Sequence, residues 1–216
     1  MKQILLLVAA FTFVAYVSCD SCVQCDSGSD VKCATDPINL PQLACANNSN
    51  TDRRCYSRVV NGFTLRGCVG ELNNKTLASC NNEMECDTCG FDGCNRQIFP
   101  MHRAQCLQCS GNSSNSSCAI EVYAMSKACP IYKLGEKCYI RNSRRVANGS
   151  FQRGCLSSAH ANKQCVKDGN CYTCEGRGCN FLQANDTLIP QARDSAVSVM
   201  LSAGLLLSTL LANSLL

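Results

Sequence analysis

Twenty cysteines in two matching sets constrain the fold of this chain more than any other feature. The decapeptide CDTCGFDGCN at residues 86–95 returns as CYTCEGRGCN at residues 171–180, and aligning the two brings ten cysteines into register with ten others. The first set is Cys22, Cys25, Cys33, Cys45, Cys55, Cys68, Cys80, Cys86, Cys89 and Cys94. The second set is Cys106, Cys109, Cys118, Cys129, Cys138, Cys155, Cys165, Cys171, Cys174 and Cys179. Matched cysteines are 83 to 87 residues apart, so the chain contains two copies of one domain.

Each copy is too short to be stabilised by an ordinary hydrophobic core. A copy spans about 75 residues and contains no Trp. Cores of such small domains rarely contribute more than about 3 to 5 kcal/mol, and small secreted domains use disulfides instead. Closing a loop of about 35 residues contributes roughly 4 kcal/mol in the chain-entropy model. We therefore expect the cysteines themselves to form the core.

The N-terminal segment has the pattern of a secretory signal peptide over residues 1–19. Lys2 supplies a positive charge, residues 4–17 are apolar, and small residues precede Asp20. We expect cleavage after Cys19; a buried N-terminal helix is disfavoured because polar residues follow at once. Removal of Cys19 leaves twenty of the 21 cysteines, an even number that disulfides can use completely. Secretion places the chain in an oxidising compartment, where cysteines form a disulfide framework.

The C-terminal segment has the pattern of a glycosylphosphatidylinositol (GPI) attachment signal. Residues 196–216 are rich in Leu and carry no charge, and small or short residues and a more polar spacer precede them. This order predicts that the tail is removed and replaced by lipid, and that residues 181–195 form a stalk that contains the attachment site. We expect attachment at Asn185, with Asp194 or Ser195 as the alternatives. A spanning helix is disfavoured because such helices are normally followed by cytosolic Lys or Arg.

Between these ends we expect a first domain at residues 20–95, a linker at 96–105 and a second domain at 106–180. Asn61-Gly62 lies between two stretches rich in Val, Phe, Thr and Tyr, which is the strongest short-range signal for a β-hairpin. Asn148-Gly149 occupies the same place in a longer hairpin of the second copy. No useful length between the ends shows helical periodicity. Each domain is predicted to be a small, disulfide-rich, antiparallel all-β fold.

The cysteine pattern resembles the three-finger, snake-toxin-like domain of the lymphocyte antigen six and urokinase receptor family. The motifs that carry the resemblance are Cys22-x-x-Cys25, Arg66-Gly67-Cys68 and Cys89-x4-Cys94-Asn95, with Arg153-Gly154-Cys155 and Cys174-x4-Cys179-Asn180 in the second copy. The similarity extends from about residue 20 to residue 180. Within the family, the chain looks most like two-domain, GPI-anchored insect members.

The resemblance implies a disulfide pairing that spacing alone does not determine, because eight cysteines already allow 105 pairings. For the first domain it implies Cys22–Cys55, Cys25–Cys33, Cys45–Cys68, Cys80–Cys86 and Cys89–Cys94. For the second it implies Cys106–Cys138, Cys109–Cys118, Cys129–Cys155, Cys165–Cys171 and Cys174–Cys179.

The chain departs from the family pattern in its third finger. Cys86 and Cys89 are separated by two residues where the family commonly has adjacent cysteines, and only five residues separate Cys80 from Cys86. The pairing among the last four cysteines of the first domain therefore stays open. The resemblance also implies that Asn95 and Asn180 hydrogen-bond back to the first strand of their domains.

No motif in the chain indicates catalysis. The Cys-x-x-Cys pairs fit a secreted disulfide framework better than zinc or redox chemistry. His102 falls in the linker and His160 in a predicted loop, and neither has the Ser, Cys or Asp partners of a catalytic triad. The glycines sit at turns rather than in a phosphate-binding loop. We therefore expect no enzymatic activity, catalytic residue, metal, cofactor or small-molecule substrate.

Charge is distributed unevenly between the two copies. Residues 20–95 carry six Lys or Arg against ten Asp or Glu, a net charge of −4, whereas residues 96–185 carry twelve against four, a net charge of +8. The long hairpin of the second copy is a candidate basic binding surface for heparan sulfate, anionic lipid or an acidic receptor face. Its candidate residues are Arg141, Arg144, Arg145 and Arg153. The alternative, that the hairpin is merely a solvated surface, is favoured. Nucleic acid is not an expected partner, because the aromatic residues are too scattered to form a base-stacking surface.

Glycosylation sequons mark exposed loops of a secreted chain. They stand at Asn47, Asn74, Asn112, Asn115 and Asn148. Asn185 is also a sequon, which anchor attachment there would remove. Together these features predict a GPI-anchored glycoprotein on the extracellular face of the plasma membrane, acting as a receptor, adhesion component or modulator of a membrane receptor or channel. Its expected partners are the membrane, through lipid, and a protein at the cell surface; the alternative is a soluble secreted inhibitor or carrier.

Overall fold

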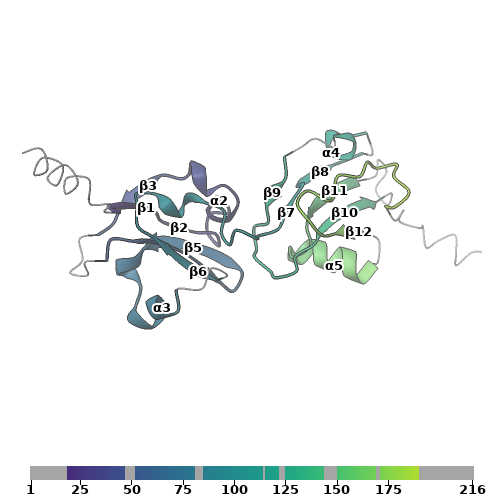
Figure 1. Ribbon diagram of the computed structural model, residues 1–216. Coiled ribbons are helices and arrows are strands. Elements are labelled where there is room, and N and C mark those ends of the chain that lie inside the picture. Colours follow the sequence, from purple (N-terminus) through teal and green to yellow (C-terminus); the bar gives the residue numbers. More distant parts are fainter. Residues whose placement is uncertain are drawn as a thin grey trace, which may run out of the picture. The chain divides into compact units, whose positions relative to one another are not determined.

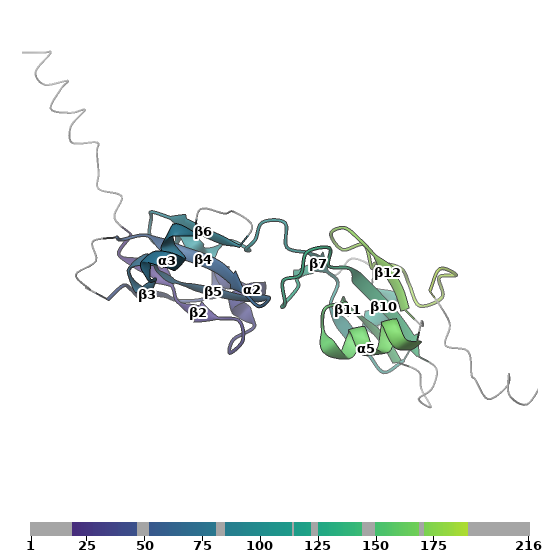
Figure 2. The same cartoon turned by 90° about the horizontal axis from the view of Figure 1, so that it is seen from below.

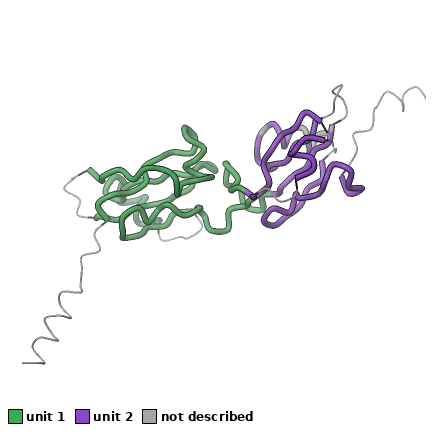
Figure 3. Tube along the Cα trace, turned by 90° about the horizontal axis from the view of Figure 1, so that it is seen from above, with its two compact units in different colours: residues 1–105, 127–136 green, residues 106–126, 137–216 purple. Residues whose placement is uncertain are grey.

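The computed structural model describes residues 19–46, 52–80, 85–113, 115–121, 125–143, 150–168 and 171–189. The chain divides into two compact units, coloured separately in Figure 3. Unit 1 contains residues 1–105 with 127–136, and unit 2 contains residues 106–126 with 137–216. Within the described ranges, no helix has both the length and the apolar character needed to cross a bilayer.

Unit 1 is built on a four-stranded antiparallel sheet in the order β2-β5-β4-β6 (Figure 2). Its strands are β2 (Cys25–Asp26), β4 (Cys55–Val60), β5 (Phe63–Cys68) and β6 (Cys86–Cys89). The hairpin between β4 and β5 turns at Asn61 and Gly62, whose φ angles are 51° and 85°. These left-handed conformations confirm the Asn-Gly turn. A separate two-stranded sheet pairs β1 (Ser21–Val23) with β3 (Gln42–Ala44).

Unit 2 contains a matching four-stranded sheet in the order β12-β10-β11-β8 (Figure 1). Its strands are β8 (Cys109–Gly111), β10 (Cys138–Ser143), β11 (Ser150–Cys155) and β12 (Cys171–Cys174). A further two-stranded sheet pairs β7 (Gln105–Cys106) with β9 (Lys127–Ala128), strands whose residues, apart from Cys106, are assigned to unit 1. The recurring order confirms two tandem, disulfide-rich, all-β three-finger domains. The expected hairpin tip at Asn148-Gly149 lies outside the described residues.

Short helical segments connect the strands. They are α2 (Lys32–Thr35), η1 (Pro37–Asn39), η2 (Val69–Glu71), α3 (Asn74–Ala78), η3 (Cys94–Arg96), α4 (Ser117–Ile120) and α5 (Ala159–Asp168). The ten-residue helix α5 corrects the expectation that His160 lies in a loop. Its first turn is closed by Ser158, whose carbonyl oxygen accepts from Asn162 N and whose Oγ accepts from Ala161 N. A serine before the first turn is a common helix start signal, but a helix this short shows little periodicity.

The disulfides follow the pairing that the resemblance implies. In unit 1 they join Cys22–Cys55, Cys25–Cys33, Cys45–Cys68, Cys80–Cys86 and Cys89–Cys94. In unit 2 they join Cys106–Cys138, Cys109–Cys118, Cys165–Cys171 and Cys174–Cys179. Cys129 and Cys155 are disulfide-bonded as well. The pairing left open among the last four cysteines of the first domain is therefore the sequential one.

The two units bury different kinds of core. In unit 1, buried sulfur dominates, as a cluster of cysteines around the Cys22–Cys55 bond. In unit 2, the cluster contains Phe151, Ile140 and Ile189 packed with smaller residues. The expectation that cysteines form the core therefore describes unit 1 well, whereas unit 2 adds an aliphatic and aromatic core.

Candidate functional site

We call the repeated decapeptide at residues 86–95 and 171–180 the closing motif. The asparagine that ends each copy hydrogen-bonds the first segment of its domain to the central hairpin. Asn95 is 3% exposed; its Oδ1 accepts from Val23 N at 3.0 Å, and its Nδ2 donates to Val23 O at 2.9 Å and Tyr56 O at 3.0 Å. Asn180 makes the same three bonds to Leu107 and Tyr139. The expectation that these residues bond back to the first strand is confirmed, and their function is structural.

The arginine of the first Arg-Gly-Cys motif is also structural. Arg66 is 3% exposed, and its Nε donates to Cys33 O at 2.9 Å. Its Nη2 donates to Gln97 O at 2.8 Å, and its Nη1 donates to Asn95 O. Burial, with a contribution from nearby Arg103, lowers the pKa of Arg66 to about 10. The side chain thus connects β5 to two other segments of unit 1, around Cys33 and at residues 95–97, through their backbone carbonyls.

Arg153 occupies the equivalent position in unit 2, and its assignment to a binding surface is wrong. It is 3% exposed and donates to Cys118 O at 2.8 Å and Asn180 O at 2.5 Å. Its guanidinium lies 4.9 Å from the centre of the Phe151 ring, and burial lowers its pKa. A charge held by internal carbonyls is not available to a partner.

The other candidate residues of the basic hairpin are only partly placed. Arg141 is half-buried in β10, opposite Gln152 and Cys171. Arg144 and Arg145 lie outside the described residues.

Sequons within the described residues lie on the surface. Asn74, Asn112, Asn115 and Asn185 are exposed, and Asn74 is the first residue of α3. Asn47 and Asn148 lie outside the described residues. A glycan at any of these exposed residues would fit on the surface of the folded chain.

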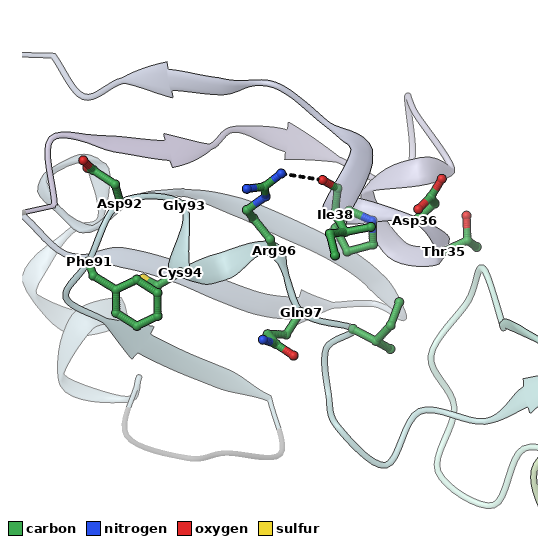
Figure 4. Close-up of a pocket in the computed structure, with 11 residues that line it drawn as sticks. Thr35, Asp36, Ile38, Phe91, Asp92, Gly93, Cys94, Arg96 and Gln97 are labelled. Atoms are coloured by element: carbon green, nitrogen blue, oxygen red, sulfur yellow. Dashed lines mark hydrogen bonds between the residues drawn. The ribbon is translucent and has the colours of Figure 1, made fainter.

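A surface pocket in unit 1 lies between the segment that follows α2 and the end of the closing motif (Figure 4). It has a volume of about 460 Å³ and is lined by residues 35–38 and by residues 91–94 and 96–98. Its apolar rim includes Ile38, which is 61% exposed, and Phe91, which is 58% exposed. We call it the closing-loop pocket.

Polar groups of the closing-loop pocket are mostly engaged within the protein. Arg96 Nη2 donates to Ile38 O at 2.7 Å, as Figure 4 shows. Asp92 Oδ1 accepts from the backbone N–H groups of Asp20 at 2.7 Å and Ser21 at 2.9 Å, and these bonds lower the pKa of the Asp92 carboxyl. Within the described part of the chain, Arg96 Nε is buried without a hydrogen-bond partner. The pocket thus offers a partner mainly apolar contact area, at Ile38 and Phe91.

One difference between the two repeats coincides with this pocket. The two decapeptides repeat their cysteines, yet Phe91-Asp92 is replaced by Gly176-Arg177 in the second copy. A difference inside a repeated framework marks a position that the fold does not fix. In unit 2, Arg177 donates to Ser126 Oγ at 3.4 Å.

The segment expected to be a linker is packed into unit 1. Arg103 is 3% exposed and donates to Phe99 O at 2.8 Å, Cys129 O at 2.7 Å and Thr64 Oγ1 at 2.5 Å. Burial lowers the pKa of Arg103 to about 10. Tyr132 N also donates to the carbonyl oxygen of Gly62 at 2.8 Å. These bonds explain why residues 127–136, which fall in the second copy by sequence, belong to unit 1.

Among the residues that the structure describes, three groups of cysteine sulfurs lie close enough together to bind a metal, but their chemistry is that of disulfides. The groups are Cys19, Cys55 and Cys94; Cys22, Cys45 and Cys68; and Cys106, Cys129 and Cys155. All except Cys19 are disulfide-bonded, and metals bind the thiolate form. Cys19 is buried, and its Sγ lies 2.7 Å from Cys55 Sγ. Burial, with the nearby Asp92 carboxylate, raises the pKa of the Cys19 thiol.

A comparison with known protein families identifies the family of both domains. No curated protein matches it. Residues 20–95 and residues 104–180 each match one family model, and together the two matches cover more than half of the chain. The chain therefore belongs to the family described as domain of unknown function (DUF753), of which it carries two copies.

Proposed function

We propose that this protein is a glycoprotein held by a GPI anchor on the extracellular face of the plasma membrane, and that it acts by binding rather than by catalysis. The observation that carries the proposal is the disulfide framework that both units repeat. Such frameworks persist in oxidising compartments. The apolar stretch at residues 4–17 and the charge-free stretch at residues 196–216 supply the matching signals for export and anchoring.

A binding role suits a fold of this kind. Disulfides and buried arginines hold the backbone, so exposed side chains on it are presented in a fixed geometry at low entropic cost. Ile38 and Phe91 are such side chains, and aromatic anchors commonly dominate protein interfaces. We propose the rim of the closing-loop pocket as the contact surface for a protein partner. Resemblance to the lymphocyte antigen six and urokinase receptor family supports a receptor, an adhesion component or a modulator of a receptor or channel.

Release by a lipase tests the anchor. The full chain would be expressed in animal cells with an epitope inserted between the signal peptide and residue 20, and the cells would be treated with phosphatidylinositol-specific phospholipase C. Release of the epitope into the medium is the expected result. Spontaneous appearance in the medium would favour the alternative, a soluble secreted inhibitor or carrier. Retention after treatment would indicate a spanning helix and would contradict the proposal.

A further inference from the structure

Residues 181–189, expected to form a stalk, complete the core of unit 2. Ile189 is 1% exposed and is among the largest fully buried side chains, and Ala184 is 9% exposed. Both belong to the cluster that contains Phe151 and Ile140. A flexible stalk would not bury an isoleucine, so the folded unit extends at least to Ile189.

Hydrogen bonds fasten the same segment along its length. Ala184 N donates to Ala119 O at 3.2 Å, and Asn142 Nδ2 donates to Ala184 O at 3.1 Å. Gln183 Nε2 donates to Ile120 O at 3.3 Å. The segment is therefore tied both to α4 and to β10, the strand that carries Asn142 (Figure 1).

A turn around Asp186 delivers Ile189 to the core. Asp186 O accepts from Ile189 N at 3.2 Å, and Asp186 Oδ1 accepts from Leu188 N at 2.9 Å. Leu188 points the other way and is 63% exposed. Both Asp186 and Ile189 lie beyond Asn185, so they would be lost if the chain were cut there.

Anchor transfer breaks the peptide bond after the attachment residue and joins that residue's carbonyl to the amine of the lipid's ethanolamine, releasing the C-terminal peptide. Transfer at Asn185 would release Ile189 and expose the apolar cluster beneath it. We propose, on the basis of the proposed GPI anchor, that transfer occurs beyond Ile189, at Asp194 or Ser195, and that Asn185 instead carries an N-linked glycan. Asp194, Ser195 and Ala196 form the run of small or short residues that transfer needs; residues 197–204, which include two Ser and one Gly, then serve as the spacer, and the Leu-rich residues 205–216 form the apolar tail. Asn185 and Thr187, the two recognised residues of the sequon, are exposed.

Two sequon variants separate glycan from anchor. Asn185→Gln removes both the sequon and a residue able to accept the anchor, whereas Thr187→Ala removes the sequon alone. We expect each variant to lose one glycan, seen as an equal mobility shift that glycosidase treatment abolishes, and to keep lipase-sensitive display. Loss of display in Asn185→Gln but not in Thr187→Ala, with no glycan lost in either, would place the anchor at Asn185 and overturn the inference.

The C-terminal peptide of lipase-released protein identifies the attachment residue directly. Mass spectrometry is expected to find residues 186–189 in the mature chain, ending at Asp194 or Ser195 with the anchor remnant. A remnant on Asn185 would overturn the inference while leaving the proposed anchor intact. Failure of the lipase to release any protein would overturn the anchor itself, and this inference with it.

Two substitutions at neighbouring positions test whether this segment is packed into the core of unit 2. Ile189→Asp places a charge in the buried cluster and is expected to lower surface display at least several-fold, because misfolded protein is retained in the secretory pathway. Leu188→Asp is the matched control, since the neighbouring side chain is exposed, and it is expected to leave display unchanged. Equal display of the two variants would show that the segment is not part of the folded unit, and would contradict the inference.

Discussion

Asn180 provides the sharpest test of how the closing motif stabilises a unit. Its side chain is fully buried, and its three hydrogen bonds join Leu107 N at 2.9 Å, Leu107 O at 3.0 Å and Tyr139 O at 3.1 Å. Asn180→Ala removes all three and leaves buried backbone groups without partners. Each buried backbone group left without a partner costs about 1 to 3 kcal/mol, so we expect a loss of roughly 3 kcal/mol or more in the free energy of unfolding.

Thermal unfolding of lipase-released protein, with its disulfides intact, measures this loss. For a domain of this size, 1 kcal/mol corresponds to a shift of about 4 to 8 °C in Tm, so Asn180→Ala should lower the Tm of unit 2 by roughly 15 °C. Asn162→Ala is the control, because Asn162 is exposed on α5 and its replacement should change stability by less than about 0.5 kcal/mol. If the two variants unfold alike, the bonds to Leu107 and Tyr139 do not fasten the unit.

Three further predictions concern surfaces and thiols. Charge reversal at Arg144 and Arg145 should weaken retention on heparin, with a difference that shrinks as salt rises; unchanged retention would remove the basic hairpin as a binding surface. Phe91→Ser should weaken binding to cells about tenfold or more, whereas Phe181→Ser, at a similarly exposed aromatic of unit 2, should not; equal effects would exclude the closing-loop pocket. Mature protein labelled with an alkylating agent after denaturation should show no free thiol, since Cys19 leaves with the signal peptide, and one labelled thiol would place cleavage before Cys19.

Local and covalent features of this protein were predictable from its sequence. The cysteine spacing gave the domain repeat, and the family resemblance supplied the disulfide pairs found in both units. The Asn61-Gly62 turn was predictable because left-handed φ angles are a local preference of these residues. The role of Asn95 and Asn180 followed from the same resemblance, since each is covalently next to its closing cysteine. Short-range chemistry decides all of these features.

Burial, in contrast, was decided by tertiary structure. Arg153 reads as one more charge on a basic hairpin, yet it is buried because the carbonyls of Cys118 and Asn180 converge on it from distant segments. By sequence Ile189 belongs to a spacer, yet its side chain packs in the core of unit 2. By sequence Arg103 belongs to a linker, yet it hydrogen-bonds to three positions in unit 1. Which cysteines repeat and where the chain turns can be inferred from the sequence, because these features depend on covalent spacing and backbone preference. Only the folded chain decided which charged and apolar side chains remain at the surface, because exposure depends on what other segments pack against them.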